Sequence, residues 1–468
     1  MRIFGGVYGG AVHRGDHPVE VINPADGAVL ATVDGVSAAQ AEAAISSARA
    51  AFPAWAALPD EERQRLMLQC ADIIEQHAEE LATLLTQEQG KPLNGLGSRF
   101  ELSMAATWTR NAANLSLPVD IIQSDDEAHV AVHRMPLGVV AAIAPWNWPL
   151  LIAIWQVMPA IRAGNTVVLK PSPFTPLSTL RLVELLQDAL PAGVLNAVVG
   201  DEAVGPMLTA HPDVAKVSFT GSSATGRRIM ASAASTLKRL TLELGGNDAG
   251  IVLPDCDPDE IAEALFWSAF INNGQTCVAL KRLYVHDDIY DGVCNALLAY
   301  ARTVKVGDGR DESSQLGPIQ NRLQYEKVSR LVERARADGA RILCGGEPSE
   351  DGGYFYPVTL IADVTDGTPI VDEEQFGPAL PIIRYSDVND AIRRANATEV
   401  GLGGSIWSKD IAKARSLATR LECGTAWVNK HGPIRPDTPF GGIKASGFGV
   451  QFGPLGLDEF VSLHVVHD

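Results

Sequence analysis

From about residue 139 to residue 244, segments with the apolar pattern of a strand alternate with segments whose apolar residues have helical spacing. This order predicts a parallel sheet with helices, an α/β fold. Val139–Ile143 is a near-continuous apolar run, which is typical of a strand buried on both faces. Strand patterns at 166–169, 195–199, 214–219 and 239–244 then alternate with helical patterns at 179–190, 203–210 and 222–235. This order indicates a sheet with helices on both faces, whose ligands bind at the carboxyl ends of the strands.

The alternation restarts after Gly245-Gly246 and predicts a second α/β domain. Its expected strands lie at 249–253, 282–285, near Ile342, and at 379–385, 404–407 and 424–429, with helices at 259–270, 289–302 and 321–337. Two more strands, at 129–135 and 459–466, have no partner nearby in the sequence. We expect them to belong to a small β element used for association.

Helical spacing marks the region before the first sheet. Ser37 and Gln40 are spaced as a capping box, which predicts a helix through about residue 51. An apolar stripe at helical spacing runs from Leu66 to Leu84, and a further helix is expected over 99–113. A short strand at 19–23 precedes them and ends in a Pro-Ala-Asp-Gly turn.

Residues 137–161 carry no formal charge and are long enough to cross a membrane. Pro145, Pro149 and Pro159 interrupt this segment, and a proline inside a helix costs about 3 kcal/mol. The segment therefore predicts a buried strand, a proline-rich turn and a buried helix, and we expect no membrane span.

Length and charge narrow the class of protein. A chain of 468 residues is too long to fold around a single hydrophobic core, so two or three domains are expected. The formal charge of −18 argues against nucleic acid or an anionic membrane as a partner. Six scattered cysteines, without a C-x-x-C pair or zinc spacing, predict neither a metal site nor a disulfide framework and fit the reducing cytoplasm.

The strongest candidate for chemistry is Cys277, in a stretch of small and polar residues that follows an apolar helical run. Gly274 allows an unusual φ or a close approach of the backbone. Lys281 and Arg282 place positive charge nearby, which favours a thiolate. Taken alone, this stretch fits a buried structural cysteine better than a nucleophile, because free cysteine is usually a small apolar residue.

Three other stretches have chemistry that would complement a nucleophilic thiol. Gly221 and Ser222 lie between a strand and a helix, where backbone N–H groups bind phosphate, although a simple helix cap explains them as well. Glu243 lies among apolar residues at a strand end, where burial would raise its pKa toward that of a general base, unless an ion pair holds it. Asn147, in a Pro-Trp-Asn-Trp-Pro turn, is a candidate oxyanion donor or a structural amide.

Seven stretches together resemble the signature motifs of the aldehyde dehydrogenase superfamily, in the family order and at family-like spacing from about residue 21 to the C-terminus. They lie at 145–150, 170–172, 219–226, 243–246, 274–277, 374–378 and 439–442. The resemblance, to the NAD(P)-dependent and non-acylating type, implies an α/β fold with three parts. These are a Rossmann-like cofactor domain (1–117 and 137–245), an α/β catalytic domain (246–445) and a small β oligomerisation arm (118–136 and 450–468). It also implies a homodimer or homotetramer.

The resemblance implies a role for each matching residue. Cys277 attacks the carbonyl of a small-molecule aldehyde, the Asn147 side chain and the Cys277 N–H hold the oxyanion, and Glu243 activates the water that releases the acid. The NAD or NADP site is expected at Trp146, Lys170, Ser172, Gly221, Ser222, Leu244, Gly245, Glu374 and Phe376. The substrate tunnel is expected at Trp148, Trp155, Thr276, Val278, Arg435 and Phe440.

Departures from the family pattern leave two questions open. Pro173 stands where NAD-preferring members often carry glutamate, and proline neither binds the ribose hydroxyls nor repels a 2′-phosphate, so we predict weak selectivity between NAD and NADP. Val450-Gln451 replaces a common Arg-Glu and is expected to affect only local packing. Arg435 and His431, near the expected tunnel mouth, motivate a hypothesis of a carboxylate or other polar tail on the substrate; the alternative is that both are solvated or contact a neighbouring subunit.

Three other functions compete with hydrolytic aldehyde oxidation. In a CoA-acylating relative, CoA would resolve the thioester, but the presence of Glu243 favours water. A non-catalytic structural relative of the fold is disfavoured because Cys277, Glu243 and Asn147 are all intact. A cysteine hydrolase without a cofactor is disfavoured by the phosphate-site motif and by Glu374.

Overall fold

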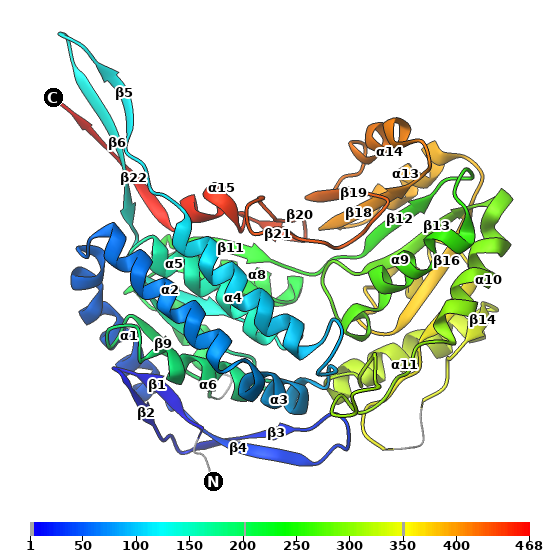
Figure 1. Cartoon of the computed structure of the whole chain (residues 1–468), viewed down its shortest axis with the longest axis horizontal. Helices are drawn as coiled ribbons and strands as arrows, with labels where there is room; N and C mark the ends of the chain where they lie inside the picture. Colours follow the sequence, from blue (N-terminus) through cyan, green and yellow to red (C-terminus); the bar gives the residue numbers. More distant parts are fainter. Residues whose placement is uncertain (1–3, 201–202, 349–351) are drawn as a thin grey trace.

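The chain forms two large sheets, each with helices packed against it, and a slender arm that projects from one of them (Figure 1). This computed structural model describes residues 4–200, 203–348 and 352–468. The N-terminal half and the end of the chain build the sheet from which the arm projects, and residues 248–428 supply the strands of the other sheet. The predicted mixed α/β architecture is confirmed.

The first sheet has eight strands in the order β2-β1-β9-β8-β7-β10-β11-β21. Its strands are β1 (Gly6–Tyr8), β2 (Ala11–His13), β7 (Val139–Ile143), β8 (Thr166–Lys170), β9 (Leu195–Ala197), β10 (Val214–Thr220), β11 (Arg239–Glu243) and β21 (Gly447–Phe448). The five central strands are parallel, as predicted. The chain runs outward from β7 to β9 and then returns to β10 on the other side, so the strand order reverses between β7 and β10. Ligands bind at such a point in open α/β sheets.

Eight helices pack around this sheet and on one another. They are α1 (Ala38–Ala56), α2 (Asp60–Gln76), α3 (Ala78–Gln89), α4 (Ser98–Asn114), α5 (Pro149–Arg162), α6 (Leu177–Leu186), α7 (Val204–Ala210) and α8 (Ser223–Ala233). The capping box of Ser37 and Gln40 opens α1 as predicted. The predicted stripe from Leu66 to Leu84 is two helices, because His77 departs from helical geometry (φ −105°, ψ 13°) and ends α2.

The second sheet has seven strands in the order β14-β15-β16-β13-β12-β18-β19. Its strands are β12 (Asp248–Val252), β13 (Leu280–His286), β14 (Arg341–Cys344), β15 (Thr359–Val364), β16 (Ala379–Tyr385), β18 (Gly403–Trp407) and β19 (Thr425–Val428). Its helices are α9 (Pro258–Phe270), α10 (Tyr290–Ala301), α11 (Arg322–Ala337), α12 (Pro369–Asp372), α13 (Val388–Asn396) and α14 (Ile411–Ala418). All strands except β14 are parallel, which confirms the predicted second α/β unit.

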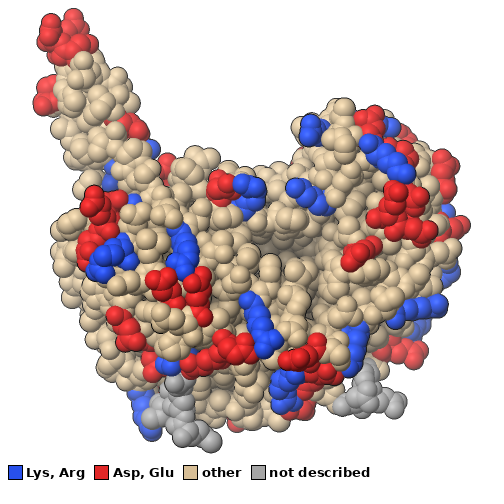
Figure 2. All heavy atoms as spheres, viewed as in Figure 1, with Lys and Arg blue, Asp and Glu red and all other residues tan. Residues whose placement is uncertain are grey.

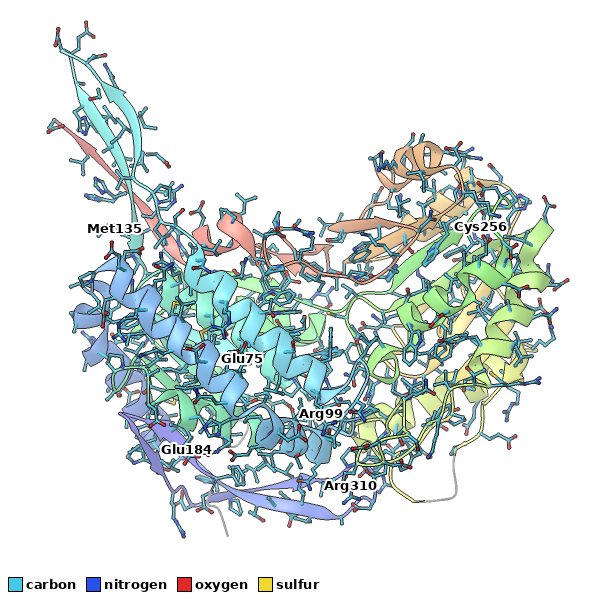
Figure 3. The ribbon with its side chains drawn as sticks, viewed as in Figure 1. Glu75, Arg99, Met135, Glu184, Cys256 and Arg310 are labelled. Atoms are coloured by element: carbon cyan, nitrogen blue, oxygen red, sulfur yellow. The ribbon has the colours of Figure 1, made fainter. Side chains whose placement is uncertain are left out.

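The arm is a three-stranded antiparallel sheet made of β5 (Asp120–Ser124), β6 (His129–Pro136) and β22 (Val461–His467). The two strands that lack a neighbour in the sequence pair with each other, from Val461 opposite Pro136 to His467 opposite Val130. Met135 marks the base of the arm in Figure 3. The chain between 447 and 458 lies instead beside the first sheet, where β21 pairs with β11 and α15 (Gly453–Asp458) contacts α5.

Two small antiparallel sheets of two strands each are also present. The strand expected at 19–23 is β3 (His17–Ile22), which pairs with β4 (Val29–Gly35) across the predicted turn. β17 (Val400–Gly401) pairs with β20 (Ile443–Lys444). The apolar pattern of the sequence did not predict either of these strand pairings.

The uncharged segment 137–161 folds as predicted into β7, a proline-rich turn and most of α5. Every residue of β7 is buried, and nearly every residue of α5 is buried as well, with Pro149 in the first turn of the helix. Among the described residues, none of the helices combines the length and the apolar character that a bilayer crossing requires. The segment is apolar because it lies at the centre of the first half of the molecule.

Candidate active site

The predicted motifs gather where the two sheets face each other. Asn147, Lys170, Ser222 and Glu243 lie at or just beyond the carboxyl ends of β7, β8, β10 and β11. The stretches ending at Cys277 and Pro378 lie just before β13 and β16. The carboxyl ends of the first sheet therefore meet the amino ends of the second, and Figure 2 shows the molecular surface hollowed between the two halves.

A strained turn delivers Cys277 to this junction. After α9, the residues Asn272, Asn273 and Gly274 all have left-handed φ values, of 50°, 57° and 73°. Such a conformation costs of order 1–3 kcal/mol at each non-glycine residue. A Cβ on Gly274 would lie 2.3 Å from the carbonyl oxygen of Gly377, so only glycine fits there, as predicted.

Cys277 is partly accessible and lines a cavity, whereas Cys70, Cys256 and Cys294 are buried elsewhere. Cys256 lies inside the second half of the molecule, away from the junction (Figure 3). Burial of the Sγ atom raises the pKa of the Cys277 thiol to about 12; nearby Lys281 lowers it, and the acidic group of Glu243 raises it. In the free enzyme the thiol is therefore protonated at neutral pH.

Glu243 ends β11 with a buried side chain. Its Oε1 atom has no hydrogen-bond partner among the described residues, and burial raises the pKa of its carboxyl well above the usual value, as predicted. An ion pair does not hold Glu243 within the described part of the chain. A carboxylate with a raised pKa is suited to accept a proton near neutral pH.

Asn147 is 3% exposed and is hydrogen-bonded to the cysteine loop. Its Nδ2 donates to the carbonyl of Gln275 at 2.9 Å, and the next residue, Trp148, donates from Nε1 to Thr276 Oγ1 at 2.9 Å. A side-chain amide carries two N–H donors. The carbonyl of Gln275 accepts one of them.

Glu374 lies against the end of the first sheet. Its Oε1 accepts a hydrogen bond from the Gly246 N–H at 3.1 Å and lies 3.1 Å from Lys281 Nζ. A Cβ on Gly245 would come within 2.6 Å of Glu374 Oε2, so a larger residue there would displace this carboxylate. Trp146 packs edge-on against Phe376, with ring centroids 5.4 Å apart.

The other predicted cofactor residues line the ends of β8, β10 and β11. Lys170 is desolvated, which lowers the pKa of its ammonium, and no carboxylate pairs with it in the described part of the chain. Ser222 caps α8 and remains exposed, and Gly226 in that helix packs directly on Leu244. Ser172 Oγ accepts from the Phe174 N–H. A lone ammonium and an open helix N-terminus fit the negatively charged phosphates of a dinucleotide.

A largely apolar cavity of about 440 Å³ adjoins Cys277. Helices α4, α5 and α9 and the segment 430–434 supply most of its wall. It is lined by Leu96, Phe100, Met104, Trp108, Trp148, Leu151, Ile152, Trp155, Ala264, Trp267, Ser268, Ile271, Thr276, Cys277, Val278, Lys430, His431, Gly432, Pro433 and Ile434.

Four of the six predicted tunnel residues line this cavity, and two do not. Trp148, Trp155, Thr276 and Val278 lie on its wall. The Arg435 side chain is 72% exposed and forms two hydrogen bonds to Asp437, and Phe440 is buried against Phe452. Both residues line a neighbouring cavity of about 530 Å³ that shares Lys430, Pro433 and Ile434 with the first one, so their place in the tunnel stays a prediction.

His431 lies on the wall of the Cys277 cavity, and neighbouring side chains surround its ring nitrogens. Its Nδ1 lies 2.9 Å from Ser405 Oγ, its Nε2 lies 3.4 Å from Asp248 Oδ2, and its side chain is fully buried. The cavity-lining residues Phe100, Met104, Trp108, Trp267 and Lys430 were not predicted from the sequence. They come from α4, α9 and the 430–434 segment, and no local motif marks them.

Comparisons with known proteins agree with this arrangement. Residues 12–466 match the aldehyde dehydrogenase family. Phenylacetaldehyde dehydrogenase of Pseudomonas fluorescens is 40% identical over 466 residues, which cover 96% of this chain and 92% of that protein. The crystal structure of an NADP-dependent enzyme of E. coli superposes with a TM-score of 0.97 at 37% identity, covering 100% of this chain and 98% of the other. A betaine aldehyde dehydrogenase of Staphylococcus aureus, solved with NAD+, gives a TM-score of 0.95 at 33% identity, covering 99% and 94%.

The helix N-terminus at Ser222, the buried carboxylate of Glu243 and the cysteine loop at Cys277 follow one another along this fold, and together they define an oxidoreductase that acts on aldehydes. The chain belongs to the aldehyde dehydrogenase family, and it is an NAD(P)-dependent oxidoreductase.

Proposed function

We propose that Cys277 is the nucleophile that attacks the aldehyde carbon, and that the second N–H of the Asn147 amide and the Cys277 N–H stabilise the oxyanion. The observation that carries this proposal is that the Cys277 thiol opens onto an apolar cavity while Asn147 is fixed to the same loop. Attack gives a thiohemiacetal on Cys277; when NAD(P)+ is bound it would supply the acceptor for the hydride of this adduct, and loss of that hydride leaves a thioester on Cys277. Glu243 then takes a proton from the water that attacks the thioester, which releases the acid and the Cys277 thiol.

The dinucleotide would lie across the ends of β8, β10 and β11. Lys170 and Ser172 would contact the adenosine ribose, Gly221 and Ser222 the pyrophosphate, and Glu374 the nicotinamide ribose. Trp146, Leu244, Gly245 and Phe376 would pack around it. We propose that both NAD and NADP are accepted with weak selectivity, because Pro173 offers neither a hydrogen bond nor a negative charge. A ratio of kcat/KM values above about a hundredfold, roughly 2.7 kcal/mol, would contradict this.

The substrate we propose is an uncharged aldehyde with an aryl or other bulky apolar group. Four tryptophans, a phenylalanine and a methionine line the cavity, and its size suits a small aromatic molecule. A carboxylate placed among these rings would lose its hydration, and the lysine on the wall, Lys430, is exposed to solvent. The likeness to a phenylacetaldehyde dehydrogenase supports the same class.

A substrate panel measured with both cofactors tests this proposal. We expect kcat/KM for phenylacetaldehyde and longer aliphatic aldehydes to exceed that for a carboxylated semialdehyde or a quaternary ammonium aldehyde by at least about tenfold. Wild type and Arg435→Ala are compared on every substrate. A carboxylated aldehyde as the best substrate would overturn the proposed class and leave the reaction type untouched.

CoA acylation is the alternative resolution of the thioester. The burial of Glu243 beside the thiol supports water as the acceptor. The product distinguishes the two: free acid is expected with or without CoA, whereas accumulation of acyl-CoA would favour the alternative.

We also propose the assembly, the domain limits and the location. Ile121, Ile122, Leu463 and Val465 expose apolar side chains on the arm, which supports a homodimer or homotetramer formed through it. The cofactor domain would comprise 1–117 and 137–245, the catalytic domain 246–445, and the arm 118–136 and 450–468, with β22 as its C-terminal strand. The scattered free cysteines support a cytoplasmic location. Light scattering of Ile122→Asp and Leu463→Asp variants tests the interface.

A further inference from the structure

A buried ion pair lies directly behind the oxyanion amide. Lys91 and Glu101 both have fully buried side chains, and Lys91 Nζ lies 2.5 Å from Glu101 Oε2. Lys91 follows α3 at the Gly-Lys-Pro that the sequence uses to end that helix, and Glu101 lies in the first turn of α4. Removing charges from water is costly, so a buried pair needs further hydrogen bonds to be tolerated.

Those hydrogen bonds all go to the turn that carries Asn147. Lys91 Nζ donates to the backbone carbonyl of Asn147 at 2.9 Å and lies 3.5 Å from the centre of the Trp148 ring. The other carboxylate oxygen, Glu101 Oε1, accepts the backbone N–H groups of Leu150 and Leu151, each at 3.0 Å. The ion pair therefore holds the backbone on both sides of Trp148. Lys91 binds the Asn147 carbonyl, and Glu101 binds the N–H groups at the start of α5.

We propose that Lys91 and Glu101 are positioning residues for aldehyde oxidation, which fix the Asn147 amide and the Trp148 ring relative to Cys277. Neither touches the substrate; each acts through the backbone of the turn. The inference rests on the proposed role of Asn147 as oxyanion donor. Oxyanion donors act by being held in place before the charge develops, so a small displacement of the amide weakens catalysis.

A second hydrogen bond to the Asn147 carbonyl limits the expected effect of removing Lys91. Asn272 Nδ2 also donates to the Asn147 carbonyl, at 2.8 Å. Loss of Lys91 thus leaves one donor on that carbonyl, and the amide is loosened but not released. We expect Lys91→Met to slow the burst of reduced cofactor about tenfold, compared with about 10² to 10³-fold for Asn147→Ala.

The decisive measurement is a double-mutant cycle on the full-length enzyme. The burst rate is recorded for wild type, Lys91→Met, Asn147→Ala and the double variant, together with the affinity for NAD and NADP and the rate of Cys277 alkylation by iodoacetamide. If Lys91 acts through Asn147, the double variant is no slower than Asn147→Ala alone. Cofactor affinity is expected to stay within about twofold of wild type, because Lys91 lies outside the proposed dinucleotide site. Additive losses, or an unchanged burst in Lys91→Met, would overturn the proposal.

Lys216 provides the matched control. It is a fully buried lysine in β10 that pairs with Glu459 at 3.4 Å and donates to Thr241, and it contacts neither the Asn147 turn nor the cysteine loop. Lys216→Met removes an equally buried ammonium, so it reports the general cost of such a loss, and its burst rate is expected to match wild type. An equal slowing in both methionine variants would assign the effect to stability.

Two further outcomes keep the test decisive. If Lys91→Met does not fold, Lys91→Met/Glu101→Leu removes both charges, a replacement that buried ion pairs often tolerate, and enters the same cycle. If Asn147→Ala itself keeps a normal burst, the proposed function of Asn147 fails. If Asn147→Ala loses the burst while the Lys91 variants keep it, the positioning role alone fails.

Discussion

Cys277 has polar groups on one side and apolar side chains on the other. On one side the loop is tied down by polar contacts: Asn147 to the Gln275 carbonyl, Trp148 to Thr276, and Lys281 Nζ to the Cys277 carbonyl at 2.5 Å. On the other side, aromatic and aliphatic side chains from α4, α5 and α9 form the cavity wall. The polar side fixes atoms by directional hydrogen bonds, whereas the apolar side only excludes charge and water.

Because of this difference, the groups that carry out the reaction are distinct from the side chains that select the substrate. The polar groups are hydrogen-bonded to backbone atoms of one another's loops, so a change in one displaces the others. The cavity side chains project from helices, and one of them can be exchanged with the backbone in place. Reaction type and substrate range should therefore respond to different substitutions.

Removal of the thiol has the largest expected effect on the polar side. Cys277→Ala should abolish both the burst of reduced cofactor and steady turnover, a loss of at least about 10³-fold, because no other group can form the covalent intermediate. Rapid mixing with NAD or NADP measures both phases. Cys256→Ala is the control, since Cys256 is buried away from the junction and should leave the burst intact. A residual burst in Cys277→Ala would locate the nucleophile elsewhere.

The next largest effect separates the two halves of the reaction. Glu243→Gln should retain the burst and lower steady turnover about 10² to 10⁴-fold, the usual contribution of a general base. The glutamine keeps the volume and polarity of the side chain but accepts no proton from water. Normal steady turnover in Glu243→Gln would disprove its assigned role.

The polar side was largely predictable from the sequence, and the reason is physical. Asn147 follows the strand β7, Glu243 ends β11, and Cys277 precedes β13, in short motifs that carry both backbone geometry and chemistry. Gly274 marks a close approach to the Gly377 backbone that leaves no space for a Cβ. A short motif can be recognised in the sequence when the residues that fix its backbone lie within it. Parallel strands then bring several such motifs together at one edge of the sheet.

The cavity was predictable only where it borders a motif. Trp148, Thr276 and Val278 were identified because they adjoin Asn147 and Cys277, whereas Phe100, Met104 and Trp267 come from helices whose apolar positions look like ordinary core. Arg435 differs from these residues: its guanidinium pairs with Asp437 and is exposed, and the residue lines the neighbouring cavity, so its tunnel role stays a prediction. Which apolar face is left open depends on packing between distant helices.

The pH dependence of the reaction sharpens the description of the polar side. Burial raises the pKa of the Cys277 thiol to about 12 and that of Glu243 well above its usual value. Both groups act in their deprotonated forms, so burst rate and steady turnover should rise with pH across the neutral range, by up to about tenfold per unit while a single group titrates. In Glu243→Gln the burst should keep its rise with pH. A burst that slows from pH 6 to pH 8 would contradict these shifts.

A charge placed in the cavity tests the apolar side. Met104 is half-buried on α4 and lines the wall. Met104→Lys should lower kcat/KM for phenylacetaldehyde about tenfold and raise it for a carboxylated aldehyde, because the ammonium penalises apolar contact and supplies a counter-charge. Met104→Leu keeps the volume and should stay within about threefold of wild type. An unchanged substrate profile in Met104→Lys would mean that substrates do not occupy this cavity.

The smallest expected effect concerns Arg435. Its guanidinium is 72% exposed and pairs with Asp437 two residues away, and exposed pairs contribute about 0 to 1 kcal/mol. Arg435→Ala should therefore change kcat/KM by less than about twofold on neutral and carboxylated aldehydes alike. Lys430 is the informative comparison, because it lies on the cavity wall and Arg435 does not. A selective loss on carboxylated aldehydes in Lys430→Ala alone would locate a weak polar preference at the cavity mouth, whereas the same loss in Arg435→Ala would require its loop to fold inward over the cavity when substrate binds.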